Sequence, residues 1–360
     1  MNRLADNNPQ TNDKTPPYNR KNRLIWSAIF VVIAVATIWT VVSESKNFSF
    51  SAFLSYINHS SKIWLLVAFL GMLGFIVFEG ESVLCICRAF GYNKNHGKGF
   101  VYSASDIYFS AITPSATGGQ PVCAFFMIKD GIPGTVTTVV LLANLAMYTL
   151  AVVVISVFSI LIRPTILLSF NPVSQTLIYL GFIVQLLLVV FLLMLLFKAD
   201  ILHKVCYNVL HFLCKIKIIK HENERADKLS VYMQGYAECA RMIKDHKQAM
   251  VKAFIFNILQ RLSIISVSVF VFLASGGNTS VSFDIFGIQC CSIIGSNIIP
   301  IPGAMGVSDF IMIDGFSKFM RDPISFELLC RSISFYICVI ICGITVLIKY
   351  WTFRKRGKQI

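Results

Sequence analysis

Two interrupted apolar segments decide the fold of this chain. They read Thr113-Pro114-Ser115-Ala116-Thr117-Gly118-Gly119-Gln120-Pro121 and Pro300-Ile301-Pro302-Gly303-Ala304-Met305-Gly306-Val307-Ser308-Asp309. Each lies near the middle of a largely apolar run, the first within 100–127 and the second within 283–316. Because proline lacks a backbone N–H donor and glycine loosens the backbone, neither run continues as one α-helix. The sequence therefore predicts two helical legs joined by a turn in each run.

The composition around these runs is that of a membrane protein. Of the 360 residues, 56% are hydrophobic and only 14% are charged, whereas ordinary soluble domains are about 25% charged. This composition excludes a cytosolic enzyme and a disordered chain. A transmembrane helix needs about 20 apolar residues to cross the bilayer core. Besides the two interrupted runs, the apolar runs of suitable length are 24–42, 63–87, 135–162, 175–197, 252–274 and 326–349.

The positions of the basic residues indicate how these runs are oriented. Five Lys or Arg precede residue 24, eleven lie in 198–252 and five follow residue 348. Basic loops are retained in the cytoplasm, so all three blocks are expected on that side. If all eight runs crossed the membrane, the 198–251 block would lie outside. The charges share one side only if 100–127 and 283–316 each dip into the membrane and return.

We therefore predict an all-α polytopic membrane protein with about six full spans plus two oppositely oriented re-entrant helical hairpins in an inverted-repeat arrangement. The alternative is that proline and glycine only kink two ordinary spanning helices. The predicted parts are a polar cytoplasmic tail at 1–23, an integral membrane domain at 24–350 with a cytoplasmic basic amphipathic insert at 198–251, and a basic cytoplasmic tail at 351–360. The hairpins are placed at about 100–127 and 283–316.

Three segments resemble those of a known family. They are FEGESVLCICRAFG at 78–91, TPSATGGQP at 113–121 and PIPGAMGVSD at 300–309. Over roughly 24–350 the chain resembles the lysylphosphatidylglycerol synthase transmembrane-region family, the membrane part of the multiple peptide resistance factor. The resemblance implies a multi-pass protein of the bacterial inner membrane that moves aminoacylated or anionic phosphatidylglycerol-type lipids between leaflets. It also implies a link to resistance against cationic peptides.

The chain departs from the family pattern at three positions. Gln120 stands where an acidic residue is more usual, and Ala304 and Ser308 stand where Gly and Arg are commoner. These side chains lie in the two interrupted stretches, which we expect to contact the lipid head group. The departures therefore bear on which head group is selected.

Two other functions stay open from the sequence. Full-length relatives also carry a soluble domain that transfers lysine from lysyl-tRNA to phosphatidylglycerol, so one alternative is a phosphatidylglycerol lysyltransferase. The longest polar insert, 198–251, has 54 residues, which is too few for a domain that binds both tRNA and lipid. We therefore expect the soluble synthase domain to be absent from this chain, and enzymatic activity stays an open question. The other alternative is an ion-coupled transporter of small solutes, with Glu79 or Asp106 as the coupling group.

Charged residues inside the apolar runs are the main candidates for function, because Asp, Lys or Arg at a helix centre costs roughly 2.5–3.5 kcal/mol on insertion. Half-helix N-termini near Pro121 and Pro302 would present free N–H groups to a lipid phosphate. A guanidinium either grips a phosphate or neutralises a carboxylate, and we favour the first role for Arg261 and the second for Arg331. The predicted lipid-binding residues are Glu79, Glu81, Asp106, Thr113, Ser115, Thr117, Gly118, Gly119, Gln120, Arg261, Gly303, Gly306, Asp309 and Arg331.

Simpler interpretations exist for some of these residues. The polar groups of the tips could serve only to satisfy the broken backbone, Glu81 could be an interfacial charge beside Arg88, and Asp309 could be a helix cap. No catalytic residue, metal or cofactor is predicted, because the histidines and cysteines show no ligand spacing. The expected partners are bilayer phospholipids, with a separate soluble synthase or a second copy of the chain as protein partners. Nucleic acid is not expected.

Overall fold

The computed structural model describes residues 57–113, 116–198, 204, 207–208, 211, 222–297 and 306–356. Every regular element in these ranges is a helix and none is a strand, so the all-α prediction is confirmed. The predicted span at 24–42 and most of the 198–221 stretch lie outside the described residues, as do Ser115 and Gly303.

Five helical stretches are long and apolar enough to cross a membrane. Each overlaps one of the apolar runs predicted as full spans. At 1.5 Å per residue, the first of them, which has 28 residues, is about 42 Å long, which exceeds the ~30 Å thickness of the hydrocarbon core. The chain is therefore an integral membrane protein. The stretches are α3 (Lys62–Ala89), α6 (Gly134–Ile162), α7 (Pro172–Phe197), α10 (Lys247–Ala274) and a continuous helix made of α13 (Pro323–Arg331), the π-helical η5 (Ser332–Ile337) and α14 (Cys338–Arg356).

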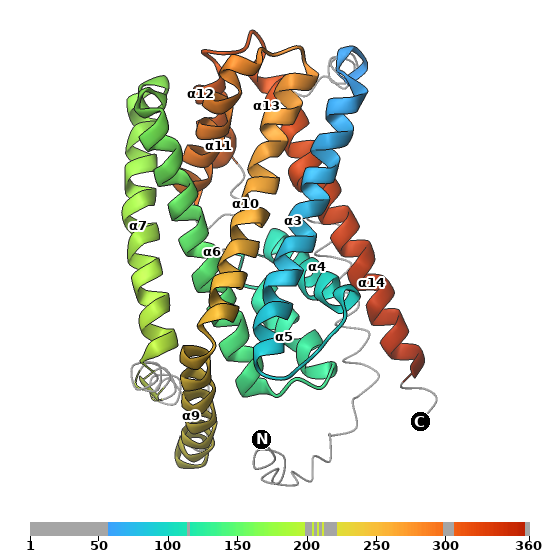
Figure 1. The fold of residues 1–360 in the computed structure, drawn as a ribbon, viewed down its shortest axis with the longest axis vertical. Coiled ribbons are helices and arrows are strands. Elements are labelled where there is room, and N and C mark those ends of the chain that lie inside the picture. Colours follow the sequence, from blue (N-terminus) through green and yellow to red (C-terminus); the bar gives the residue numbers. More distant parts are fainter. Residues whose placement is uncertain are drawn as a thin grey trace. The chain divides into compact units, whose positions relative to one another are not determined.

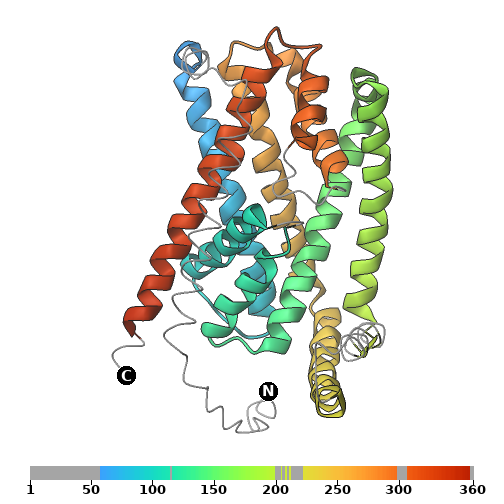
Figure 2. The ribbon, with the colours of Figure 1, turned by 180° about the vertical axis from the view of Figure 1, so that it is seen from behind.

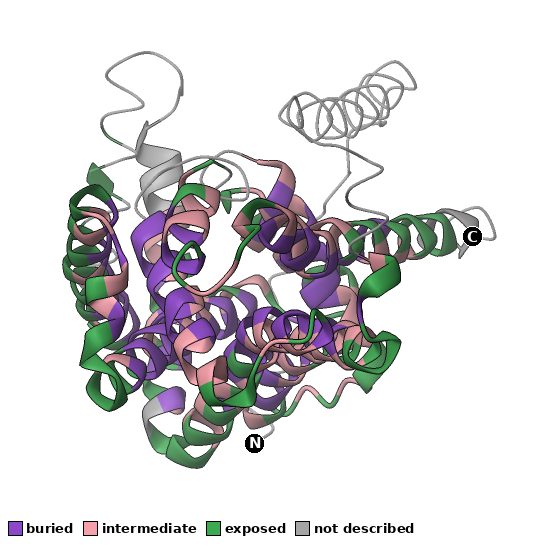
Figure 3. Ribbon diagram, turned by 90° about the horizontal axis from the view of Figure 1, so that it is seen from above, coloured by how far each residue is buried: buried purple, intermediate pink, exposed green. Residues whose placement is uncertain are grey.

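The outward surfaces of the long helices are apolar, which reverses the pattern of a soluble protein. In α7, Leu187 is 65% exposed, whereas Gly181 and Gln185 of the same helix are buried. Figure 3 shows exposed residues along the outer sides of the helices and buried residues between them. Large exposed apolar surfaces mark sites of contact with apolar partners, and here the length of the helices identifies that partner as lipid.

The helices α3 and α10 form a closely packed central pair (Figure 1). A Cβ added at Gly71 would lie 3.1 Å from Ser263 O, so a small residue is needed at this crossing. A buried polar cluster then ties the pair to α6. Ser82 Oγ donates to Asn144 Oδ1 at 2.6 Å, and Asn257 Nδ2 donates to Ser82 Oγ at 2.7 Å. These bonds fix the rotation of the three helices relative to one another.

The first interrupted run forms two short helices, α4 (His96–Ile112) and α5 (Gly119–Lys129). At 17 and 11 residues they are about 26 and 17 Å long, less than the hydrocarbon core. The open end of this pair is closed by Asp130, which follows α5. Its carboxylate accepts from Tyr102 Oη at 2.8 Å and lies 3.1 Å from Lys98 Nζ, and both partners are in the first half of α4. The chain therefore leaves the pair beside the point where it entered.

The second interrupted run forms α11 (Ser282–Ser296) and α12 (Val307–Phe316). The end of α12 is held by the segment between α6 and α7, which includes η2 (Pro164–Ser169). Asn171 N donates to Asp314 Oδ2 at 2.8 Å, and Lys318 Nζ donates to Leu168 O at 2.5 Å. A Cβ on Gly287 of α11 would overlap the Ile166 side chain of the same segment. Figures 1 and 2 show α4–α5 and α11–α12 toward opposite ends of α3 and α10.

Candidate functional site

A cavity of about 700 Å³ lies between the two helix pairs. Pockets for small ligands commonly measure about 300–1,000 Å³. Its wall is made by the spanning helices α3, α6 and α10, by the short helices of both pairs and by the helix that runs from α13 into α14. The charged and amide side chains on this wall are Glu79, Asp106, Gln120, Asn144, Arg261, Gln289, Asn297, Glu327 and Arg331.

One side of the cavity holds two neighbouring carboxyl groups, from Glu79 of α3 and Asp106 of α4. Glu79 is buried and accepts a hydrogen bond from Gln260 Nε2 at 3.0 Å. Asp106 accepts from Gln120 Nε2 at 2.8 Å and from Ser110 Oγ at 3.5 Å. Amide and hydroxyl donors thus orient both acids, which come from separate apolar runs and share one wall.

The Asp106 carboxylate lies at the N-terminus of α5. A Cβ added at Gly119, the first residue of α5, would overlap both Asp106 Oδ1 and Ser110 Oγ. Glycine is therefore required for this approach. The N-terminus of a helix stabilises a negative charge, and here a carboxylate of the protein supplies one.

Arg261 of α10 is buried and lines the cavity between two aromatic rings. Its Cζ lies 5.1 Å from the ring centroid of Phe75 and 4.4 Å from that of Tyr148. Its Nε donates to Gln260 Oε1 at 3.1 Å. Within the described parts of the chain Arg261 makes no ion pair, and a guanidinium has five N–H donors. Cation–π contacts hold this group in place while it keeps hydrogen-bonding capacity for an anion.

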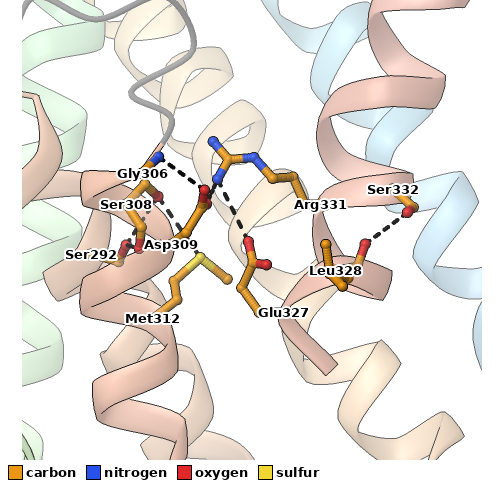
Figure 4. Close-up of polar contacts among 9 residues, drawn as sticks. All are labelled: Ser292, Gly306, Ser308, Asp309, Met312, Glu327, Leu328, Arg331 and Ser332. Atoms are coloured by element: carbon orange, nitrogen blue, oxygen red, sulfur yellow. Dashed lines mark hydrogen bonds and ion pairs between the residues drawn. The ribbon is translucent and has the colours of Figure 1, made fainter. Parts of the chain in front are cut away.

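The opposite side of the cavity holds Arg331, which is paired with Asp309 of α12. Its Nη1 also lies 3.6 Å from Oε1 of Glu327, one helical turn earlier. Figure 4 shows the three side chains pointing toward one another. Asp309 Oδ2 also accepts a hydrogen bond from Gly306 N, at 3.0 Å. Gly306 has a φ of 80°, a conformation that favours glycine. Asp309 thus caps the N-terminus of α12. In both helix pairs a carboxylate therefore lies at the N-terminus of the second helix, Asp106 at α5 and Asp309 at α12.

The helix that carries Arg331 changes its geometry directly after this residue. Residues 332–337 form a π-helix, and Ser334 and Phe335 of this segment line the cavity. The Phe335 ring centroid lies 5.7 Å from Arg331 Cζ. Single π-helical turns are rare and occur frequently at functional sites. The widened turn therefore lies against the part of the cavity that holds the Asp309–Arg331 pair.

Three other predicted residues of the first tip, Thr113, Thr117 and Gly118, are not among the residues that line the cavity. Thr113 Oγ1 donates to Phe109 O at 2.6 Å and accepts from Gly118 N at 2.9 Å, and Thr117 is exposed. These bonds of Thr113 satisfy the broken backbone, as the simpler interpretation of the sequence proposed. Ser115 lies outside the described residues.

Glu81 is also separate from the cavity. Its Oε2 lies 3.6 Å from Arg88 Nη2, and its other carboxylate oxygen is paired with His96 Nδ1. The pairing with Arg88 matches the interfacial interpretation of this residue. Glu79 and Glu81 are two positions apart in α3, so their side chains point about 200° apart around the helix, and only Glu79 faces the cavity.

Gly303, a predicted residue of the second tip, lies outside the described residues.

Several residues of the site were not predicted from the sequence, among them Asn144, Gln289, Asn297 and Tyr148. Two others contact the predicted charges directly. Glu327 is buried and paired with Arg331, and its i,i+4 spacing from an arginine inside an apolar run was an available signal. Gln260 links Glu79 to Arg261 through its amide. Nothing in the sequence distinguishes this glutamine from other polar residues of α10, since its role depends on its neighbours in space.

The site is built from charged, amide and aromatic groups. Among the described residues there is no group of three or more His, Cys, Asp or Glu that could hold a metal ion. The nine cysteines in the described ranges are free and buried, where thiols behave as small hydrophobes. The chemistry that these residues can supply is hydrogen bonding and charge pairing to a polar ligand.

Comparison with known proteins places these features in one family. A family model described as the lysylphosphatidylglycerol synthase TM region matches residues 25–342. The match includes both helix pairs and every charged residue of the cavity wall. A comparison with curated proteins found no match.

Proposed function

Because the chain belongs to the lysylphosphatidylglycerol synthase transmembrane-region family, we propose that it binds phospholipid head groups in the cavity and moves the lipids between the leaflets of the bacterial cell membrane. The observation that carries the proposal is a cavity of about 700 Å³, lined by charged residues, between helices with apolar outer surfaces. Buried charges in a membrane protein are costly and typically mark the path of a polar substrate.

The proposed topology has six full spans, with 24–42 as the first, and two re-entrant hairpins that enter from opposite faces. Short legs support this arrangement, since α4, α5, α11 and α12 each fall below the thickness of the hydrocarbon core. Hydrogen bonds at the open ends also support it, because one joins the two legs of the first pair and another joins α12 to the segment before α7. Both termini are then cytoplasmic, and the two halves form an inverted repeat with the substrate site between them.

Within this topology, Arg261 contacts the lipid phosphate. It is the cavity arginine that makes no ion pair in the described residues, whereas Arg331 is already paired with two carboxylates. The acids Glu79 and Asp106, on the same wall, face the ammonium group of an aminoacylated head group. These fixed charges replace water around the head group, which lowers the cost of taking it through the membrane, while the acyl chains stay in the bilayer. No covalent step is required.

The proposed activity also accounts for the link to cationic peptides. Moving an aminoacylated lipid to the outer leaflet adds positive charge to a surface that is otherwise negative. Cationic peptides are drawn to anionic lipid surfaces by about 1 kcal/mol per basic residue. A less negative outer leaflet therefore binds such peptides more weakly.

The test is translocation by the purified full chain in vesicles. Phosphatidylglycerol with a fluorescent acyl chain is followed by quenching with a membrane-impermeant reductant. The double variant Gly119→Leu and Arg261→Ala disturbs the Asp106 site and removes the guanidinium, and it is expected to slow translocation at least tenfold. The control is Arg163→Ala, at an exposed position between α6 and η2, which is expected to leave the translocation rate unchanged. Equal rates for all three proteins would refute the site. Lysyl-lipid formed from lysyl-tRNA by this chain alone would instead support the lysyltransferase alternative.

A further inference from the structure

A second cavity, of about 800 Å³, lies between the C-terminal end of α3 and the N-terminal end of α10. None of its lining residues belongs to the first cavity. We call it the basic cleft. Its lining includes three basic residues, Arg88, Lys247 and Lys252, which we call the basic rim. It also includes three apolar residues, Ala89, Ile255 and Phe256, which we call the apolar floor.

The rim of the basic cleft carries a net positive charge. Three basic residues line it against one acid, Asp245, among the residues that the structure describes, so the formal sum is +2 with histidine neutral. Arg88 is 3.6 Å from Glu81, which partly neutralises it. Neither Lys247 nor Lys252 has an ion-pair partner in the described ranges, and both are exposed. The two lysines are therefore available to an anion from outside the chain.

An exposed apolar stripe runs from this rim along α10. Lys252, Ile255, Leu259 and Leu262 are spaced by three, four and three residues, which places them on one face of the helix. Ile255 is 50% exposed, Leu259 37% and Leu262 36%. This combination of a basic end and an apolar stripe matches a phospholipid, with its phosphate at the rim and its acyl chains along the helix.

The helix α3 repeats this arrangement on the other side of the cleft. Leu66, Val77 and Arg88 are eleven residues apart, about three helical turns, and so lie on one face. All three side chains are exposed. Both helices thus offer an apolar face that ends in a basic residue at the cleft. Basic pockets between membrane helices on the cytoplasmic side suit anionic head groups.

We propose that the basic cleft binds an anionic phospholipid of the cytoplasmic leaflet, with the phosphate between Lys247 and Lys252 and the acyl chains on the Ile255–Leu262 stripe. The site is distinct from the cavity proposed for transport, and it rests on the cytoplasmic orientation given above. A soluble phosphate would pair with the lysines but would make no contact with the apolar side chains of Ile255 and Phe256. The apolar floor is therefore the reason for choosing a lipid as the occupant.

A tryptophan reporter tests the proposal in the full chain. The four native tryptophans are changed to phenylalanine, and Ile255→Trp is reconstituted in phosphatidylcholine vesicles that contain a minor fraction of brominated lipid. Brominated phosphatidylglycerol is expected to quench this reporter more strongly than brominated phosphatidylcholine does. The matched reporter Leu187→Trp, on the exposed face of α7, is expected to show no such preference.

Charge variants then identify the groups that bind. Lys247→Gln and Lys252→Gln are each expected to lower the preference for phosphatidylglycerol about 5-fold, the effect of one basic residue near an anionic surface. Lys129→Gln, an exposed lysine at the end of α5, is the matched control and leaves the preference unchanged. If Ile255→Trp disturbs folding, Leu259→Trp reports on the same stripe one turn further on.

Three results would overturn the proposal. They are equal quenching by the two brominated lipids at both stripe positions, a preference that survives the double lysine variant, and a preference abolished by soluble glycerol phosphate. The last result would assign the cleft to a free phosphate compound. The quenching assay measures lipid occupancy of the basic cleft and not lipid movement. A negative result in the translocation test would therefore not change the result expected from quenching.

Discussion

Gln120 Nε2 donates a 2.8 Å hydrogen bond to Asp106 Oδ2, which links the two legs of the first helix pair close to its tip. The resemblance noted from the sequence predicted an acidic residue at position 120. Here such a residue would add a third carboxyl group beside Asp106 and Glu79. The amide therefore turns an expected repulsion into an attraction, and it allows α4 and α5 to approach at Gly119.

Changing this amide is the first test of that relationship. Gln120→Glu is expected to lower the Tm and the translocation rate more than Gln120→Met does. The methionine removes a hydrogen bond to a charged group, worth about 1.5–3 kcal/mol, whereas the glutamate adds like-charge repulsion. Thermal unfolding in detergent measures the first effect and the vesicle assay the second. Equal stability of the glutamate variant and the wild type would show that Asp106 does not depend on this donor.

Removing Arg331 is expected to destabilise the fold strongly. Arg331→Met leaves Asp309 and Glu327 without their shared cation, and breaking a buried ion pair in this way costs about 3–5 kcal/mol. The expected result is a large fall in Tm in detergent. Arg331→Met combined with Asp309→Asn and Glu327→Gln should recover most of it, since no buried charge is then unpaired. Exposed Arg321 gives the control Arg321→Met, and a similar Tm loss there would argue against the pairing.

The buried polar cluster of α3, α6 and α10 is expected to behave as one unit. Asn257 Nδ2 bonds both Ser82 Oγ at 2.7 Å and Asn144 Oδ1 at 3.1 Å. Asn257→Leu alone removes the amide donor from Ser82 Oγ and Asn144 Oδ1, which keep the bond between them, and should cost about 1–3 kcal/mol. Asn144→Leu with Asn257→Leu should cost less than the sum of the two single changes. Strict additivity in this double-mutant cycle would mean that the two amides do not interact.

The aromatic pair around Arg261 is expected to affect lipid affinity. Tyr148→Leu removes the nearer ring, and a desolvated cation–π contact is worth up to about 2 kcal/mol, or about 30-fold in affinity. The apparent affinity for phosphatidylglycerol, taken from the concentration dependence of translocation, should therefore weaken by several-fold. Tyr148→Phe keeps the ring and serves as the matched control. An equal loss in both variants would assign the effect to the hydroxyl group.

The proposed topology predicts the side on which each loop lies. In a chain whose native cysteines are replaced, Lys129→Cys should react with an impermeant thiol reagent only from the cytoplasm and Arg163→Cys only from the periplasm. Lys198→Cys, at the start of the basic insert, is the cytoplasmic reference. Periplasmic labelling at Lys129 together with cytoplasmic labelling at Arg163 would exclude the re-entrant arrangement, and the transport site proposed between the hairpins would be lost with it.

Several features of the site could be anticipated from the chain alone. Glu79, Asp106, Arg261 and Arg331 stood out because charges are rare inside apolar runs, and all four line the cavity. Thr113 was predicted with them, yet its hydroxyl bonds the backbone of the tip. Its sequence context cannot separate the two roles, since a hydroxyl can serve a ligand or a broken helix equally well.

The sequence by itself determined the helical class and the positions of five long helices, because apolar length and helix-breaking residues act locally along the chain. Only the tertiary structure decided that Glu79 faces the cavity while Glu81 pairs with Arg88 and His96. It also decided that Gln260 serves both Glu79 and Arg261. These contacts depend on how each helix is rotated against its neighbours, and that rotation is set by the packing of small residues and buried amides between segments far apart in the chain.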